Sequence, residues 1–335
     1  MSKSSGWAAG RFFVVVALVA VMPWAAQAVT VETFGNWTVS FYGSGETNAY
    51  ETGEQNWTAE QIADVGAAIN AWQQYVGNVP GRPIYLHAFW TEMGTAGANQ
   101  YILGGSASYR ISDGTQTWQL GEYVWKEGDD PGTTPYGFDT IITYDITAGS
   151  ASWNFGSSNP DAGEVDFRSV VAHEIGHSVG FDTSYDHDYD DWGWFSTNYG
   201  GLTDYDRNLV DSLGNHPENG SSGTPGDFNE LDNPVYWDGD AAMAWNDNAL
   251  VAIYAPATWV PGSSLSHLDE TTFPNALMSP SIATGQMIRE PGELELAMMK
   301  DMGWTVVPEP ATAMLVVLGG TILARRRFRR AAGRP

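Results

Sequence analysis

The segment Glu164–Val179 constrains the fold of this 335-residue chain more than any other feature. Its apolar residues recur at helical spacing and Gly180 follows directly, which predicts a helix with a glycine stop. His173 and His177 lie in its second half, with Glu174 between them. Histidines four residues apart project from one helix face, where both imidazoles can reach one metal ion. This helix is therefore expected to carry the chemistry of the protein.

The available residue types favour zinc as the metal. The chain has no cysteine, which excludes disulfides, thiolate metal sites and a cysteine nucleophile, and leaves histidine and carboxylate as ligands. Glu174 sits beside the histidine face, where its carboxylate can accept a proton from zinc-bound water. The resulting hydroxide can attack a peptide carbonyl that the same ion polarises. These residues therefore predict Zn²⁺-dependent hydrolysis of a protein or peptide substrate.

Two segments resemble a known peptidase family. Phe167–Ala172, leading into the histidine pair, resembles the active-site helix of the metzincins, particularly the bacterial matrixin-like peptidases. Ala276–Pro280, with the sequence Ala-Leu-Met-Ser-Pro, resembles their Met-turn. The resemblance spans roughly residues 36–304. It implies a zinc metalloendopeptidase with Glu174 as general base and with Met278 as an apolar floor beneath the metal.

The same resemblance implies an α/β (α+β) zincin-like fold. In this fold a twisted mixed β-sheet and an N-terminal helix precede the active-site helix, and a C-terminal helix follows the Met-turn. The residue pattern fits this order, because a capping box begins one apolar helical stripe and β-branched and aromatic runs predict strands. The predicted elements are helix Thr58–Val76, strands Pro83–Trp90, Thr140–Tyr144 and Leu250–Tyr254, and helix Gly292–Met302, which ends before Gly303.

The third zinc ligand departs from the family pattern. Metzincins place it six residues after the second histidine, where this chain has Thr183, and a threonine hydroxyl is a poor zinc ligand. We favour His267, because it lies eleven residues before the Met-turn methionine and should run near the metal. Asp182 and His187 remain alternatives. The predicted metal ligands are therefore His267 and the two helix histidines.

Other polar residues have weaker claims to a place in the site. His87 lies inside a predicted strand, which is typical of a structural histidine, and His216 lies in a turn where it is expected to be solvated. Asp269 could orient a ligand or be an ordinary exposed loop carboxylate. The acidic segment Asp182–Asp191 does not follow the EF-hand arrangement, but its oxygen donors make Ca²⁺ a second candidate cofactor.

The start of the chain is predicted to be a secretory signal peptide over residues 1–28. Lys3 and Arg11 precede an apolar run at Phe12–Met22, and Ala26-Gln27-Ala28 supplies a small-x-small cleavage pattern. An uncleaved anchor is the alternative, but the run is shorter than the roughly 20 residues that a membrane span needs. Both interpretations predict export.

Residues 307–335 resemble a PEP-CTERM sorting signal. Pro308-Glu309-Pro310 is followed by an uncharged stretch, Ala311–Ala324, and then by an arginine cluster. The resemblance implies recognition by an exosortase-type sorting enzyme and transient inner-membrane contact through a short transmembrane helix. The expected location is secreted or at the cell surface of a Gram-negative-type bacterium. Residues 29–306 remain as the metallopeptidase domain, with a loop-rich insertion at about 182–248.

Strong acidity between the two ends excludes nucleic acid as an expected partner. Eight of the 15 basic residues and one of the 40 acidic residues lie in the end segments, so seven bases face thirty-nine acids elsewhere. Such a balance repels nucleic acid and favours cation binding. Two non-enzymatic alternatives remain. One is a zinc-stabilised surface or extracellular-matrix protein, and the other is a glycan-binding module, suggested by 15 Trp and 15 Tyr.

Overall fold

The structure is a computed structural model that describes residues 29–77, 80–97, 100–108, 110–112, 116–128, 137–185, 202–217 and 234–307. The predicted signal peptide, nearly all of the predicted sorting tail and His187 lie outside these residues. In the described part, no helix is long and apolar enough to cross a membrane. The described residues form a mixed α/β fold with five α-helices and a mixed β-sheet.

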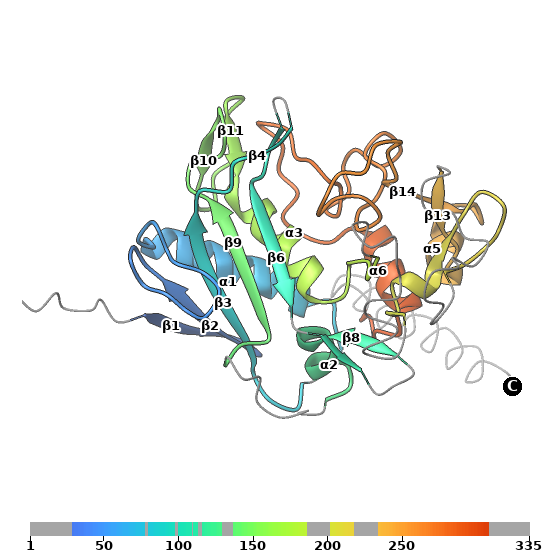
Figure 1. Ribbon diagram of the computed structural model, residues 1–335, viewed down its shortest axis with the longest axis horizontal. Helices are drawn as coiled ribbons and strands as arrows, with labels where there is room; N and C mark the ends of the chain where they lie inside the picture. The colour runs from blue at the N-terminus through green and yellow to red at the C-terminus, as the bar shows by residue number, and fades with distance from the viewer. Residues whose placement is uncertain are drawn as a thin grey trace, which may run out of the picture.

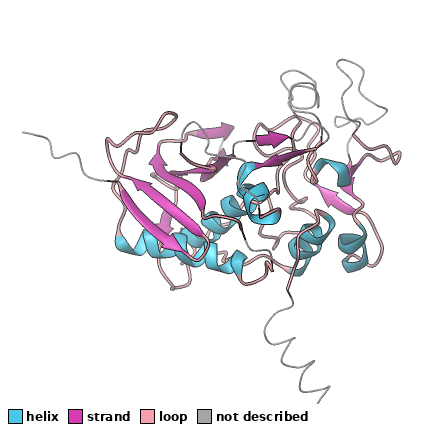
Figure 2. Cartoon of the chain, turned by 90° about the horizontal axis from the view of Figure 1, so that it is seen from below, coloured by secondary structure: helices cyan, strands magenta, loops and turns pink. Residues whose placement is uncertain are grey.

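A five-stranded sheet forms the centre of the fold (Figure 1). In spatial order its strands are β1 (Thr30–Phe34), β2 (Trp37–Tyr42), β3 (Ile84–Thr91), β9 (Thr140–Asp145) and β6 (Gly104–Ser108). β2, β3 and β9 run parallel, whereas β1 and β6 pair antiparallel at the two edges. The strands predicted at Pro83–Trp90 and Thr140–Tyr144 correspond to β3 and β9 within one residue at each end. Figure 2 shows helices lying along one face of this sheet.

Helix α1 (Ala59–Gln73) begins at the predicted capping box. The Thr58 hydroxyl accepts a hydrogen bond from Gln61 N at 3.2 Å, and Thr58 N donates to Gln61 Oε1 at 2.8 Å. This reciprocal pair satisfies backbone N–H groups that have no partner inside the helix. The prediction placed the end of the helix too late, because Val76 instead forms a bridge with Val306.

Helix α3 (Phe167–Ser178) carries the histidine pair, and its predicted start was wrong. Residues Glu164–Asp166 form strand β11, and the carboxylate of its last residue caps the helix by accepting from Ser169 N at 3.0 Å. The apolar pattern alone could not separate a short strand from the first helical turn. The predicted end is confirmed, because Gly180 follows in the left-handed region at φ +108°.

Helix α3 packs closely against α1 and against the turn that carries Met278. Trp72 Nε1 on α1 donates to the carbonyl of Ala172 at 2.7 Å. Met278 is fully buried, and a Cβ added at Gly176 would lie 2.4 Å from its sulfur atom. The helix therefore approaches this methionine so closely only because residue 176 has no side chain.

The predicted loop-rich insertion is more ordered than expected in its described part. It contains η1 (Asp206–Asn208), β12 (Leu209–Val210), β13 (Val235–Trp237) and α5 (Asp240–Trp245). β12 and β13 form a small antiparallel sheet with β14 (Val251–Ile253), the strand predicted at Leu250–Tyr254. Strands of two or three residues are too short to produce a visible hydrophobic period. The predicted C-terminal helix is present as α6 (Glu293–Asp301) and packs against α5.

Smaller elements and a large aromatic core complete the fold. The remaining elements are β4 (Thr95–Gly97), β5 (Gln100–Tyr101), β7 (Arg110–Ser112), β8 (Thr117–Gln119), α2 (Leu120–Lys126) and β10 (Ser152–Asn154). Five tryptophans are at most 1% exposed, namely Trp37, Trp72, Trp90, Trp125 and Trp237. Core packing therefore accounts for a substantial part of the tryptophan content, without a glycan-binding surface.

We expect Gly176→Ala to destabilise the protein by up to about 2 kcal/mol. The added methyl group overlaps buried Met278, which costs about 1–3 kcal/mol, and alanine returns about 1 kcal/mol through its higher helix propensity. Urea unfolding would measure the free energy of unfolding of each variant. Gly163→Ala is the matched control, since no atom lies within 4 Å of a Cβ there. Equal stability of the two variants would show that the methionine has room to move.

Helix α2 meets the end of α3 at a buried carboxylate. Glu122 is 2% exposed, and a Cβ added at Gly180 would lie 2.9 Å from its Cδ atom. Burial is the largest effect and raises the pKa of Glu122 to about 7, while the ammonium of Lys126, 3.6 Å from Oε1, opposes the rise. The folded protein therefore binds a proton at this carboxyl more tightly than the unfolded chain does.

Glu122 should make the protein less stable as the pH rises. Its folded pKa exceeds the ordinary value of 4.5, so its contribution is fully present below pH 4.5 and is lost as the pH passes through about 7. We expect Glu122→Gln to remove about 3 kcal/mol of the stability that the natural protein loses as the pH rises. Urea unfolding at pH 5 and pH 8 would measure it, with the exposed Glu127→Gln as control. An unchanged pH dependence in Glu122→Gln would contradict this assignment.

Candidate metal centre

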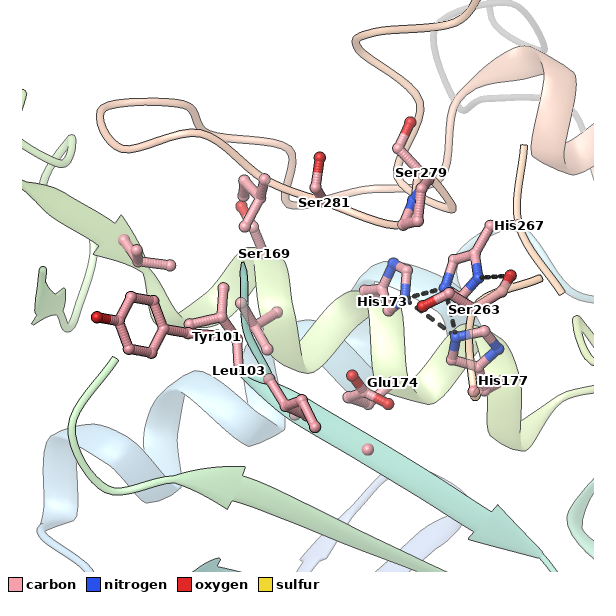
Figure 3. A pocket seen from close by; sticks show the side chains of 18 of the residues that line it. Tyr101, Leu103, Ser169, His173, Glu174, His177, Ser263, His267, Ser279 and Ser281 are labelled. Carbon is pink, nitrogen blue, oxygen red and sulfur yellow. Dashed lines mark hydrogen bonds between the residues drawn. The ribbon is translucent and has the colours of Figure 1, made fainter. Parts of the chain in front are cut away.

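Three histidine side chains converge at one end of α3. His173 and His177 come from the helix itself, and His267 comes from the loop between β14 and α6. Nε2 of His173 lies 3.0 Å from Nε2 of both other rings, and the remaining pair, His177 and His267, is separated by 3.2 Å. Figure 3 shows the three imidazoles pointing toward one another. The structure thus brings all three predicted ligands into one cluster.

The opposite nitrogen of each ring is fixed by a backbone carbonyl. The three acceptors are the carbonyl oxygens of Leu277 for His173, Phe181 for His177 and Ser263 for His267. A carbonyl oxygen only accepts, so each Nδ1 must carry the proton. Each Nε2 of a neutral ring therefore presents a lone pair to the centre of the cluster.

Electrostatics keep these rings neutral. Burial lowers the pKa of His173 to about 3 and that of His177 to about 4. Burial also lowers the pKa of His267 well below its ordinary value, and the neighbouring histidines lower it further. Three lone pairs this close repel one another unless a cation lies between them. Nitrogen ligands at 2.0–2.1 Å from a tetrahedral zinc ion stand about 3.3 Å apart. The donor set therefore fits Zn²⁺.

Glu174 lies beside the cluster, between α3 and strand β6 (Figure 3). Its side chain is buried, and a Cβ added at Gly104 of β6 would lie 2.8 Å from Glu174 Oε1. The strand can pass this close only because glycine occupies position 104. Burial raises the pKa of Glu174 to about 8, and the negative charge of Asp182 adds to the rise. The site thus contains a carboxylate with a high affinity for a proton.

The cluster and Glu174 open into a cavity of about 690 Å³. In Figure 3 the cavity extends from the histidines along α3 toward Ser169 and Tyr101. β6 lines one side, and the segment 276–282 lines the other. Apolar side chains form much of its wall, including Leu103, Val165, Val170, Leu277, Ile282 and Ile288. The cavity therefore offers apolar contact area next to the candidate metal centre.

Of the two alternative ligands, the structure describes only Asp182. His187 lies outside the described residues, as does most of the acidic segment considered for Ca²⁺. Asp182 is engaged elsewhere, because Oδ1 accepts from Ser266 Oγ at 2.8 Å and Oδ2 pairs with Arg110 at 3.2 Å. The predicted ligand set is thus the one that the described residues assemble.

The two other histidines that the structure describes have separate surroundings. His87 is 8% exposed, and its Nδ1 lies 3.1 Å from Nδ2 of Asn48. Burial lowers the pKa of His87 to about 4. His216 is largely exposed, with Nε2 3.2 Å from a carboxylate oxygen of Asp238. Both agree with the roles expected for them, a structural and a solvated histidine.

Asp269 does not orient His267. Its Oδ1 atom accepts from the backbone N of Thr272 at 2.8 Å and from the hydroxyl of the same residue at 2.6 Å. These bonds close the local turn, and the carbonyl of Ser263 takes the orienting role instead. Of the two roles considered for Asp269, these bonds therefore support the ordinary loop carboxylate and not the ligand-orienting role.

Comparisons with models of known protein families, with curated proteins and with solved structures found no match to this chain. Several features of the site could not be found from the sequence. The three carbonyl acceptors leave no trace in residue identity, since every residue carries the same group. The Gly104-Gly105 pair inside a strand was a usable signal that we did not interpret, because strand glycines often mark close approach.

We expect the purified protein to bind one Zn²⁺ per chain through the three histidines. His267→Ala should weaken the affinity by more than the about 10- to 100-fold that is lost with a residue hydrogen-bonded to a ligand, because it removes the ligand itself. Plasma emission would measure metal content and chelator competition the affinity. His216→Ala is the control, as it removes a histidine outside the cluster. Unchanged binding in His267→Ala would exclude it as a ligand.

Proposed function

We propose that this protein is a zinc-dependent endopeptidase, with His173, His177 and His267 as metal ligands and Glu174 as general base. One observation carries the proposal. Three Nε2 lone pairs within 3.2 Å of one another stand beside a buried carboxylate on the wall of an open cavity. Three protein ligands and an open position are typical of catalytic zinc sites, whereas structural sites use four. This favours an enzyme over a zinc-stabilised surface protein.

The metzincin resemblance and the zincin-like fold belong to the same proposal. Sheet strands and α1 precede α3, and α6 follows the turn at Ala276–Pro280, which is the order the resemblance implies. Met278 is buried against Gly176, beneath the helix turn that carries the histidines. The third ligand is the departure, since it comes from a distant loop and not from the segment after α3.

Bound zinc would polarise the scissile carbonyl and acidify the attacking water. The residues of the chain supply the remaining functions. Glu174 accepts the proton of the water and passes it to the leaving amine, which requires a carboxylate with a high proton affinity in a sheltered position. Burial provides that affinity, and Gly104 leaves the space in which the carboxylate sits. The backbone carbonyls hold the imidazoles in the tautomer that binds metal.

The cavity wall supports a peptide as substrate. β6 is an edge strand of the five-stranded sheet, and Gly104, Gly105 and Ser106 of this strand line the cavity. An edge strand presents unpaired backbone N–H and C=O groups, which an extended peptide can join as an additional strand. Apolar side chains across the cavity would then contact side chains of the substrate. Extended polypeptide fits these features better than a small compact molecule.

Export, sorting and cell-surface location are proposed from the two ends of the sequence. A signal peptide at residues 1–28 and an exosortase-type sorting signal at 307–335 would deliver the domain beyond the inner membrane. Zn²⁺ is the proposed cofactor. Ca²⁺ is a second candidate, which only the oxygen donors of the acidic segment Asp182–Asp191 support.

Glu174→Gln should lower kcat/KM for peptide hydrolysis by about 10²- to 10⁴-fold, because the amide cannot accept the proton. Zinc content should stay at one per chain, since the ligands are untouched. Quenched fluorogenic peptides and unfolded proteins would serve as substrates, with Glu32→Gln on the exposed edge strand β1 as a control of equal charge change.

The two contrary outcomes have different meanings. Full activity in Glu174→Gln would refute the role of this residue as general base. A zinc-loaded natural protein that is inert toward varied unfolded substrates would favour the non-catalytic surface or matrix protein.

A further inference from the structure

The segment Phe181–Ser184 follows α3 and contacts both elements that carry metal ligands. The carbonyl of Phe181 accepts the Nδ1–H of His177. The next residue, Asp182, accepts a hydrogen bond from Ser266 Oγ at 2.8 Å. Ser266 directly precedes His267, so consecutive residues hold a ligand from the helix and the neighbour of the ligand from the loop.

Ser266 has a second bond to the same segment. The backbone N of Thr183 donates to Ser266 Oγ at 3.3 Å, so the hydroxyl accepts from one residue and donates to the residue before it. Ser266 is 4% exposed. The bond from Thr183 N is buried, where losing a partner is costly, and the bond to Asp182 is half-buried because this carboxylate lines the cavity. We call Asp182, Thr183 and Ser266 the loop clamp.

The far side of the clamp is anchored by other elements. Oδ2 of Asp182 receives Nη2 of Arg110 at 3.2 Å and Nε2 of Gln119 at 3.1 Å. Arg110 Nη2 also donates to the carbonyl of Thr183 at 3.1 Å. Strands β7 and β8, which supply these two donors, therefore hold the carboxylate in one orientation.

Asp206, in the described part of the insertion, binds the loop clamp through Thr183 and the residue after it. This carboxylate is fully buried in η1 and accepts from Thr183 Oγ1 at 2.9 Å and Ser184 N at 3.0 Å. It also accepts from the N and Oγ1 of Thr203, at 3.1 and 2.7 Å. A buried carboxylate with this many donors fixes the backbone around it. The residue at the position of the family's third ligand, Thr183, thus serves as an attachment point.

We propose that Asp182 and Ser266 are positioning residues that hold His267 at the metal centre. The inference rests on the metal site of the proposed function and does not require peptidase activity. A ligand on a long loop loses entropy when it is ordered, and a preformed clamp meets that cost before the metal binds. Where the metzincin pattern has a ligand after α3, this chain has hydrogen bonds that fix a ligand from another segment.

The test measures zinc affinity by chelator competition in full-length protein. Ser266→Ala and Asp182→Ala should each weaken binding by about 10- to 100-fold, as expected for partners that orient a ligand. Together they should cost little more than either alone, because they break the same bond. Asp269→Ala is the matched control, since its carboxylate bonds only within its own turn on the other side of His267. It should leave the affinity unchanged.

A second measurement separates positioning from general damage to the fold. In a His267→Ala background, Ser266→Ala should no longer change the remaining zinc affinity, because the ligand it positions is gone. An equal loss in both backgrounds would overturn the proposal, as would full affinity in the Ser266→Ala single variant. A natural protein that binds no zinc would overturn both this inference and the proposed function. Inactivity of a zinc-loaded protein whose variants behave as expected would overturn the peptidase alone.

Discussion

The hydrogen bonds from three imidazole Nδ1–H groups to backbone carbonyls are the interactions on which the site depends. They fix the tautomer, so that every Nε2 is a free donor to a metal. They also determine where the three rings can lie, since each carbonyl belongs to a different segment. Leu277 is in the turn below α3, Phe181 follows the helix, and Ser263 lies four residues before His267. The positions of these three segments therefore determine the geometry of the cluster.

Close packing sets the position of one of these segments, the turn that carries Leu277. Gly176 allows the turn of Met278 to press against α3, which brings the carbonyl of Leu277 to His173. Glu295 of α6 is almost fully buried and accepts a hydrogen bond from Met278 N at 3.3 Å, so the C-terminal helix holds this turn from the other side. Gly104 likewise allows a close contact, because its missing side chain leaves the space in which the Glu174 carboxylate lies. Two glycines thus admit the close contacts around which the candidate site is built.

Long-range hydrogen bonding has a comparable role on the loop side. The insertion supplies Asp206, and strands β7 and β8 supply partners for Asp182, although neither element contributes a predicted ligand. Buried polar networks of this kind are costly if left incomplete and specific when satisfied. The region that looked like a loop-rich insertion therefore has a structural function next to the candidate metal centre, in the part of it that the structure describes.

The sequence by itself determined the elements whose signals are local. Helical periodicity with a glycine stop gave α3, a capping box gave the start of α1, and histidines four residues apart had to share one helix face. His267 was predicted only through the resemblance of the Met-turn, and the role of Asp269 stayed open because backbone acceptors are invisible in sequence. Tertiary structure decided which distant segments meet: the loop of His267 with α3, Gly104 with Glu174, and Asp182 with Ser266. These contacts depend on packing and buried hydrogen bonds between residues far apart in the chain, and no local pattern encodes them.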